Sequence, residues 1–415
     1  NPPSPFLIDQ KAFPPLGILH LAAAAREAGL DVLVRDLAGR ESDMAGALND
    51  LHGDLFGITA TTPQYPWAKE VLRHVRRHNP GAIFVVGGAH PSSVPQVCLR
   101  DGFDAAVKGE GERAIMKVAR EGARGVIEMP YVKDIDGLPL PARDLIDLRE
   151  YAYAVDGRKA TTIITSRGCP FRCSFCSKDV WKHRVRYHSV SRVVREIREC
   201  IERYGFGHFL FLDDTITLNR RRLLEMCRAI EPLGVGWRAY ARTDTTTRDM
   251  LVAMKRAGCV EIGIGVESGS QVILDAACKG TTVAQSTRLV QDAKELGIAT
   301  NAFIMIGLPG ESLETVAATR RWMEENRPDK FGYNIFAPYM GTPVHEHPEN
   351  YDITLYPMPD ERSWVKGRED EYEAFVATSH LSREDILRLF KENFVYFQNL
   401  LNWRPGIGRV EGRKG

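Results

Sequence analysis

The sequence predicts an α/β fold in two parts: a doubly wound parallel sheet first, then a partial barrel of six strand–helix units. A small, mainly helical region is expected to follow them. Short apolar and β-branched runs alternate with helical patterns along most of the chain. Polar side chains gather on the loops that follow the strands, and ligands of parallel sheets bind at those ends.

Length and composition limit the class of protein. The 415 residues suggest two or three domains, and the hydrophobic share of 44% is ordinary for a globular protein. A net charge of +1 gives no electrostatic case for a nucleic-acid partner or a membrane surface. No stretch approaches the roughly 18 apolar residues of a membrane span, and no secretory signal is visible. The eight cysteines do not suggest a disulfide framework, so we expect a cytoplasmic protein.

The first predicted domain covers residues 1–130. Its opening residues, Asn1-Pro2-Pro3-Ser4-Pro5, are typical of a loop after a strand, and we expect that strand to be missing from this sequence. The remaining elements are strands at 31–37, 55–60, 82–86 and 103–107, with helices at 18–28, 42–51, 67–78 and after 112. The proline-containing stretch 131–160 is predicted to be an interdomain linker.

The second predicted domain, residues 161–345, repeats the alternation of strand and helix. Its six strands are expected at 161–165, 208–214, 237–242, 260–267, 301–307 and 331–336. The tail, residues 346–415, begins with a proline-rich stretch at 348–366. Residues 382–402 then form a predicted amphipathic helix, which either packs on the barrel or serves as a substrate lid. Residues 410–415 are expected to be disordered.

A cysteine-rich loop follows the first barrel strand. Cys169, Cys173 and Cys176 are spaced C-x-x-x-C-x-x-C. Thiolates are the usual protein ligands of iron–sulfur clusters, and three of them can hold three corners of a cubane and leave the fourth iron open. A zinc site normally has four protein ligands, or three with a catalytic water, and no fourth Cys or close CxxC pair stands nearby to close one. The alternatives are three incidental thiols or a disulfide pair.

This motif, with Phe175 directly before the last cysteine, resembles the signature of the radical S-adenosylmethionine (SAM) superfamily. The resemblance implies that the three cysteines bind a four-iron, four-sulfur cluster, that SAM chelates its open iron, and that SAM is cleaved to a 5′-deoxyadenosyl radical. The resemblance also implies SAM contacts: Asp213 and Asp214 at the methionine amine, Glu267 and Ser268 at the ribose, and Phe175, Gly307, Pro309 and Gly310 at the adenine. Arg242 and Lys279 are either carboxylate contacts or surface ion-pair partners.

The loops of the first domain resemble those of the Rossmann-like cobalamin-binding domain. Thr59-Ala-Thr61 stands where that family has S-x-L, and Gly87-Gly88 would allow close approach to a nucleotide tail. None of these loops is a dinucleotide fingerprint. The implied cobalamin contacts are Pro2, Pro3, Thr59, Thr61, Thr62, Gln64, Tyr65, Gly87, Gly88, His90, Pro91, Ser92, Gly109 and Glu110.

The sequence departs from that family in one respect, because it lacks the D-x-H-x-x-G motif whose histidine ligates cobalt from below. We therefore expect no protein nitrogen under the metal. Water or the Thr61–Tyr65 loop would meet the lower face, with Gln64 and Tyr65 nearest. His90 is either a loop histidine bonded to backbone or a contact of cobalamin or substrate.

Residues 1–345 together resemble the cobalamin-dependent radical SAM enzymes. The resemblance implies a methyltransferase that methylates an unactivated carbon of a small molecule, such as a natural product, and takes electrons from a flavodoxin or ferredoxin. A cyclase or rearrangement enzyme with the same cofactors is an alternative, and so is a non-enzymatic cobalamin sensor with a structural cluster. A methylthiotransferase is disfavoured, because the first domain offers only Cys98 toward a second cluster.

Overall fold

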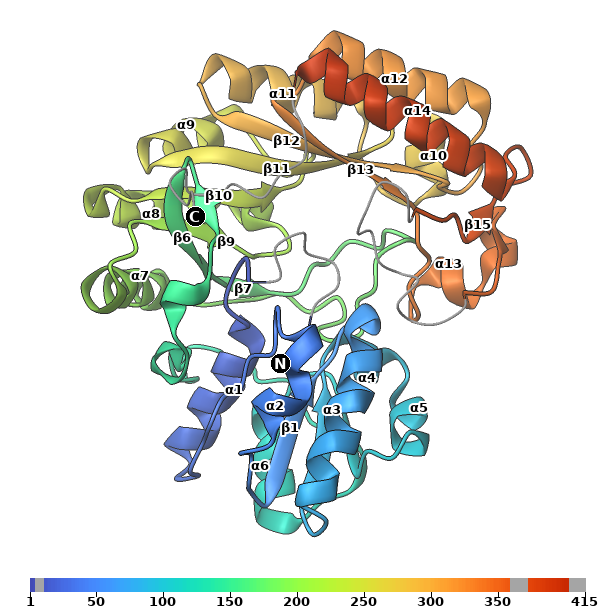
Figure 1. The fold of residues 1–415 in the computed structure, drawn as a ribbon. Coiled ribbons are helices and arrows are strands. Elements are labelled where there is room, and N and C mark those ends of the chain that lie inside the picture. Colours follow the sequence, from blue (N-terminus) through green and yellow to red (C-terminus); the bar gives the residue numbers. More distant parts are fainter. Residues whose placement is uncertain (4–10, 359–371, 403–415) are drawn as a thin grey trace. The chain divides into compact units, whose positions relative to one another are not determined.

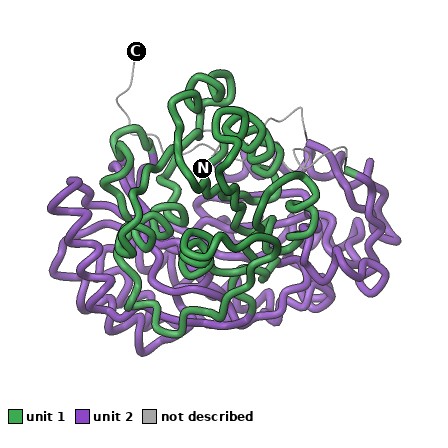
Figure 2. The backbone as a smooth tube through the Cα atoms, turned by 90° about the horizontal axis from the view of Figure 1, so that it is seen from below, with its two compact units in different colours: residues 1–152, 177–182, 358–371 green, residues 153–176, 183–357, 372–415 purple. Residues whose placement is uncertain are grey.

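The computed structural model describes residues 1–3, 11–358 and 372–402, and these residues form two compact units (Figure 2). Unit 1 comprises residues 1–3, 11–152, 177–182 and 358, and unit 2 comprises residues 153–176, 183–357 and 372–402. The division between them falls inside the predicted linker of residues 131–160. The expectation for residues 410–415 lies outside the described residues, as does the end of the proline-rich stretch.

Unit 1 is built on a sheet of four parallel strands in the order β1-β2-β3-β4 (Figure 1). The strands are β1 (Leu55–Thr59), β2 (Ile83–Gly87), β3 (Ala105–Lys108) and β4 (Gly125–Glu128). Its helices are α1 (Leu16–Glu27), α2 (Met44–Leu48), α3 (Tyr65–His78), α4 (Ala89–Ser93), α5 (Pro95–Arg100) and α6 (Glu112–Glu121). Short 3-10 turns are η1 (Glu41–Asp43), η2 (Thr62–Gln64), η3 (Arg143–Leu145) and η4 (Leu148–Glu150).

Apolar side chains cover both faces of this sheet. Phe84 and Val86 of β2 pack in one core with Leu72 of α3, whereas Val85 packs in the opposite core with Ala114 of α6. Neighbouring strand residues point to opposite faces, so a strand covered on both sides reads as a continuous apolar run. The predicted α/β class is confirmed.

Three details of unit 1 differ from the sequence prediction. Residues 31–37 do not form a strand, although two backbone bonds join them to Asn1, whose ammonium donates to the Arg35 carbonyl and whose carbonyl accepts from the Leu37 N–H. The predicted helix 42–51 is shortened to η1 and α2. Strand β4 was not predicted, because its sequence Gly-Val-Ile-Glu has only two apolar side chains, of which Ile127 alone is buried.

Unit 2 contains a curled sheet in the order β13-β12-β11-β10-β9-β6-β5 (Figure 1). Six of these strands are parallel, as predicted, and β5 pairs with β6 in the antiparallel sense. The strands are β5 (Ala154–Val155), β6 (Arg158–Ile163), β9 (His208–Phe211), β10 (Gly236–Ala241), β11 (Cys259–Glu267), β12 (Ala299–Ile306) and β13 (Lys330–Ile335). Two small ladders pair β7 (Ser166–Arg167) with β8 (Arg186–Tyr187) and β14 (Thr354–Leu355) with β15 (Val376–Ala377).

Helices cover one face of this sheet and leave the other partly open. Along β12, Ala302 and Ile304 are fully buried, whereas Phe303 and Met305 on the other face are half-buried. The helices and turns are α7 (Val190–Tyr204), η5 (Ile216–Leu218), α8 (Arg220–Ile230), η6 (Glu231–Leu233), α9 (Arg248–Arg256), α10 (Gln271–Ala276), α11 (Val283–Glu295), α12 (Leu313–Asn326), α13 (Pro343–Glu346), η7 (Pro348–Tyr351) and α14 (Arg383–Leu401).

Helix α14 packs on the outer strand of the barrel, as the simpler of the two sequence interpretations predicted. Ser382 caps its first turn by accepting from the Asp385 N–H. The ring of Phe390 stacks on Tyr333 of β13 with 5.2 Å between centroids, and Phe397 meets Phe331 at 5.7 Å. Within the described part of the chain, no helix is long and apolar enough to cross a membrane.

Candidate functional site

The cysteine loop directly follows β7, the short strand that comes after β6. Gly168 takes a φ of +89°, a left-handed conformation that glycine adopts at little cost, and the chain turns there into Cys169. Cys169 and Cys173 are 7% and 8% exposed, and Cys176 is half-buried. All three are free thiols on one loop. No three Cys, His, Asp or Glu side chains in the described ranges converge on a single metal ion. A cubane does not need that convergence, since each cysteine binds a different iron.

Asp213, which follows β9, fixes the strand end just before this loop. Its carboxylate accepts from the Thr165 N–H at 3.1 Å, from the Thr165 hydroxyl at 2.8 Å and from the Ser166 hydroxyl. Burial raises the pKa of Asp213. Arg222 of α8 donates to the carbonyl oxygens of Thr165 and His188, both at 2.9 Å.

These bonds change the interpretation of the Asp213-Asp214 pair. The sequence suggests that both aspartates contact the methionine amine of SAM. In the structure both oxygens of Asp213 already bind the chain that carries the cysteine loop, and Asp214 is exposed. Asp213 therefore positions the loop, and this role depends on hydrogen-bond geometry that the sequence does not show.

Arg242, at the end of β10, lies directly against the cysteine loop. Its Nη1 is 3.5 Å from the sulfur of Cys173, and its guanidinium carbon is 3.7 Å from the centroid of the Phe171 ring. Nε donates to Asp244 at 2.7 Å, and Nη2 donates to the carbonyl of Lys279. Arg242 and Lys279 are 6% and 7% exposed, so the alternative that they form surface ion pairs is wrong.

Glu267 closes β11 beside the same loop. Its oxygen Oε1 is 2.6 Å from Nζ of Lys279, and that ammonium lies 5.7 Å from the centre of the Phe175 ring. A side chain at Gly265 would collide with this ion pair, so the glycine leaves room for it. Ser268, expected beside the ribose, is fully buried and within 3.1 Å of the Thr319 hydroxyl of α12, so its hydroxyl already has a partner.

The glycine-rich turn after β12 has a buried carboxyl at its centre. Gly307 and Gly310 have φ of +87° and +72°. Glu311 accepts from the backbone N–H groups of Gly307 and Leu308, and burial raises its pKa to about 8. Glu311 was missing from the predicted site residues, although it ends the turn Gly307-Leu-Pro-Gly-Glu311 itself.

In unit 1, two strand-end loops meet through backbone. Gly88 has a φ of +110°, and a Cβ there would lie 2.7 Å from the carbonyl oxygen of Ala60. Only glycine allows this approach between the loops after β1 and β2. Ser92 donates to the Gly88 carbonyl at 2.7 Å and accepts from the Gly109 N–H at 3.1 Å, which adds the loop after β3.

Several predicted cobalamin contacts have structural partners of their own. Gln64 accepts from the Thr61 N–H and donates to the carbonyl of Pro2 at 3.2 Å, which ties the opening loop to η2. Glu110 accepts from the Val132 N–H at 2.9 Å. Both side chains are buried, so neither projects from its loop.

His90 and Tyr65 lie in the core of unit 1. Their rings stack with 4.0 Å between centroids, and the Tyr65 hydroxyl donates to Asp101 at 2.8 Å. His90 is 1% exposed; its Nδ1 lies 3.3 Å from the Thr62 hydroxyl, and its Nε2 has no partner among the described residues. Burial lowers the pKa of His90 to about 4, so the ring is neutral at pH 7. The expectation that Gln64 and Tyr65 face cobalt therefore conflicts with their burial and existing bonds.

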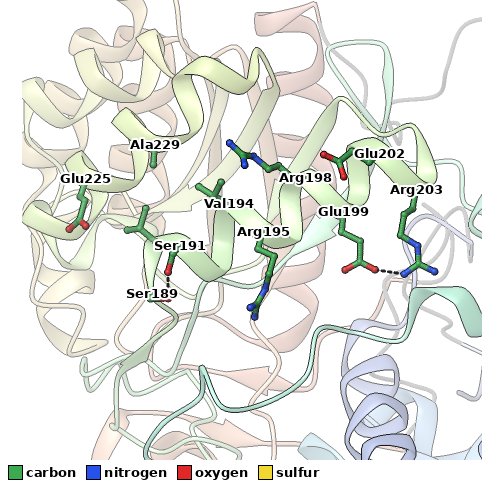
Figure 3. A pocket seen from close by; sticks show the side chains of 11 residues that line it. Ser189, Ser191, Val194, Arg195, Arg198, Glu199, Glu202, Arg203, Glu225 and Ala229 are labelled. Atoms are coloured by element: carbon green, nitrogen blue, oxygen red, sulfur yellow. Dashed lines mark hydrogen bonds and ion pairs between the residues drawn. The ribbon is translucent and has the colours of Figure 1, made fainter.

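A separate surface groove of about 900 Å³ lies along α7 and α8. Figure 3 shows its side chains, among which Arg203 pairs with Glu199 at 2.7 Å. None of the residues predicted to bind a cofactor lines it. This groove is thus not the candidate site.

Two protein-family models match this chain. The model of the radical SAM superfamily matches residues 163–323, and that of the B12 binding domain matches residues 10–119. An uncharacterised methyltransferase of Pyrococcus horikoshii is 31% identical over 92% of this chain and 87% of its own length. The anaerobic magnesium-protoporphyrin IX monomethyl ester cyclase of Cereibacter sphaeroides is 28% identical over 83% of this chain, which covers only 62% of that protein.

A solved structure shares the fold. The radical SAM methyltransferase TsrM of Kitasatospora setae, with tryptophan substrate and a SAM analogue bound, has a TM-score of 0.74 and 19% identity, over 96% of this chain and 88% of that one. The fold and the cysteine loop define a radical SAM enzyme. With its B12 binding domain, the chain belongs to the cobalamin-dependent radical SAM family, whose cofactors are a four-iron, four-sulfur cluster, SAM and cobalamin.

Proposed function

We propose that this enzyme is a methyltransferase that moves a methyl group from SAM, through cobalamin, to an unactivated carbon of a small molecule. The observation that carries the proposal is the likeness to the Pyrococcus horikoshii methyltransferase, which extends over 92% of this chain and therefore over both units. When bound, the cluster supplies the electron that cleaves SAM, and cobalamin supplies the methyl group.

In this proposal, Cys169, Cys173 and Cys176 hold the cluster. The fit is supported by three free thiols on a loop fixed at its base by Asp213. It is also supported by the cation of Arg242 beside one of the sulfurs, since thiolate-bound clusters are negatively charged.

Glu267 and the glycine-rich turn would hold SAM. The Glu267 carboxylate keeps a second oxygen beyond its bond to Lys279, and a carboxylate suits a ribose diol. Gly307 and Gly310 leave the turn open for close approach of the adenine, beside Phe175. The buried carboxyl of Glu311 holds the backbone of that turn in shape.

Cobalamin would lie on the loops of unit 1 that Gly88, Ser92 and Gly109 join. The approach of Gly88 to the Ala60 carbonyl presents bare backbone, which suits a bulky nucleotide tail. The electron donor would be a small flavodoxin or ferredoxin.

One alternative has support of its own. The 28% identity to the magnesium-protoporphyrin IX monomethyl ester cyclase favours a cyclisation with the same cofactors and no net methylation. Tetrapyrroles therefore belong in the set of candidate substrates, together with tryptophan, the substrate bound in the fold relative.

The test is an anaerobic reaction with SAM that carries a deuterated methyl group, a chemical reductant, cobalamin and the candidate substrates. Mass spectrometry should find the labelled methyl group in one product, and 5′-deoxyadenosine should accumulate with it. Cys173→Ala is the control and should give neither. A product that contains no label but differs from the substrate would refute methyl transfer and favour the cyclase alternative.

A further inference from the structure

The guanidinium of Arg242 is directed at a cluster cysteine and is held there on all sides. Each of its three nitrogens has a partner: Nε binds the Asp244 carboxylate, Nη2 the Lys279 carbonyl, and Nη1 approaches the Cys173 sulfur at 3.5 Å. The ring of Phe171 covers its flat face. A side chain fixed at every nitrogen and 6% exposed cannot swing toward a distant ligand.

This placement differs from that of Lys279, the second cation beside the loop. The Lys279 ammonium is directed at the Glu267 carboxylate at 2.6 Å, so its charge is compensated within a buried ion pair. Arg242 also has a carboxylate partner, but Asp244 binds Nε, whereas the sulfur lies at Nη1. The Arg242 edge that faces Cys173 therefore presents both a positive charge and an N–H donor.

We propose that Arg242 sets the reduction potential of the iron–sulfur cluster through this N–H···S contact with Cys173. Reduction adds one negative charge to the cluster. A nearby cation and a donor to a ligand sulfur stabilise that added charge, and such outer contacts are a recognised way in which proteins tune clusters. Arg242 raises the potential and so eases transfer of the electron from the donor. Arg242 is thus a positioning residue that acts through Cys173.

The stacking of Phe171 makes the contact specific. Phe171 lies in the loop between Cys169 and Cys173, and its ring centre is 3.7 Å from the guanidinium carbon. A lysine at position 242 would keep the charge but lose the planar fork that stacks and bonds at three nitrogens. In Arg242→Lys the reduction potential of the cluster should therefore be raised less than in the parent, and in Arg242→Gln this rise should be absent.

The test is a potentiometric titration of the reconstituted cluster, followed by electron paramagnetic resonance without SAM. Iron is counted first in each variant. Arg242→Gln should lower the potential by at least the equivalent of a tenfold change in the equilibrium constant, which is 59 mV for a one-electron couple. Arg242→Lys should lie between Arg242→Gln and the parent. Arg248→Gln, which removes the charge of a half-exposed arginine on α9, should leave the potential unchanged.

Several outcomes decide the matter. Full iron content in Arg242→Gln with an unchanged potential would overturn the inference. If SAM affinity falls instead, Arg242 is a carboxylate contact. If Arg242→Gln does not hold iron, the reduction potential of Arg242→Lys is compared with that of the parent. Equal potentials in these two proteins would again refute the proposal. The inference rests on the proposed cluster at Cys173, and loss of iron in Cys173→Ala tests that assignment separately.

Discussion

Glu267→Gln should weaken SAM binding at least tenfold while the cluster and cobalamin stay bound. Glutamine keeps the size of Glu267 and one oxygen toward Lys279, but it loses the charge that would accept from the ribose. A hydrogen bond to a charged group contributes about 1.5–3 kcal/mol, which corresponds to roughly 10- to 150-fold in affinity. Glu267→Ala is a poorer probe, since it would leave the buried Lys279 ammonium without the side-chain oxygen that accepts from it, and removal of one partner of a buried ion pair costs about 3–5 kcal/mol.

Strand β11 itself offers a matched control at its other end. Glu261 is also buried and bonded to a lysine, with 2.6 Å to Nζ of Lys330 and a further 3.1 Å contact with Arg238. Glu261→Gln should disturb the fold to a similar degree yet leave SAM affinity unchanged, because Glu261 lies near the start of the strand that Glu267 ends.

The assay is isothermal titration of SAM into anaerobically reconstituted protein, with iron and cobalamin content matched among the variants. If Glu267→Gln binds SAM as tightly as the parent, or if Glu261→Gln weakens binding equally, the carboxylate of Glu267 has only a structural role. Either result would refute the ribose assignment.

Three further predictions follow from buried groups. Asp213→Asn should reduce the iron retained after reconstitution and cost about 1.5–3 kcal/mol of stability per weakened hydrogen bond. Asp214→Asn, at an exposed position, should change neither the iron content nor the stability. An iron assay and denaturant unfolding of both variants check this. His90→Ala should leave the paramagnetic resonance spectrum of Co(II) unchanged, and nitrogen splitting that disappears in this variant would contradict the burial argument. Burial raises the pKa of Glu311 from 4.5 to about 8, so the folded state keeps a proton that the unfolded state releases, and stability should fall as pH rises between these values and then level off. Thermal unfolding across this range should show the decline in the parent and lose it in Glu311→Gln.

The sequence predicted the elements whose signal is local. Six parallel barrel strands and the cysteine loop follow from apolar runs, glycine positions and spacing. The stretch 31–37 was predicted wrongly, because an apolar run reports the tendency to form a strand but not the presence of a neighbouring strand, and no sheet of the described residues includes it. Strand β4 was not predicted because it has only two apolar residues between a glycine and a glutamate.

Side-chain roles were harder to predict, because they depend on which residues meet across the fold. Asp213 and Thr165 are 48 residues apart, and Arg242 and Cys173 are 69 apart. A carboxylate at a strand end looks the same in sequence whether it faces a ligand or the loop base. Tyr65 and His90 likewise follow strands, but stacking and burial direct them into the core.

Iron content and 5′-deoxyadenosine formation in the three motif variants test the central claim most directly. Cys169→Ala, Cys173→Ala and Cys176→Ala should each lose the intact cluster and form no 5′-deoxyadenosine from SAM under anaerobic, reducing conditions. Cys200→Ala and Cys278→Ala, on α7 and after α10, should keep both. A motif variant that retains a full cluster and cleaves SAM at the parent rate would contradict the account.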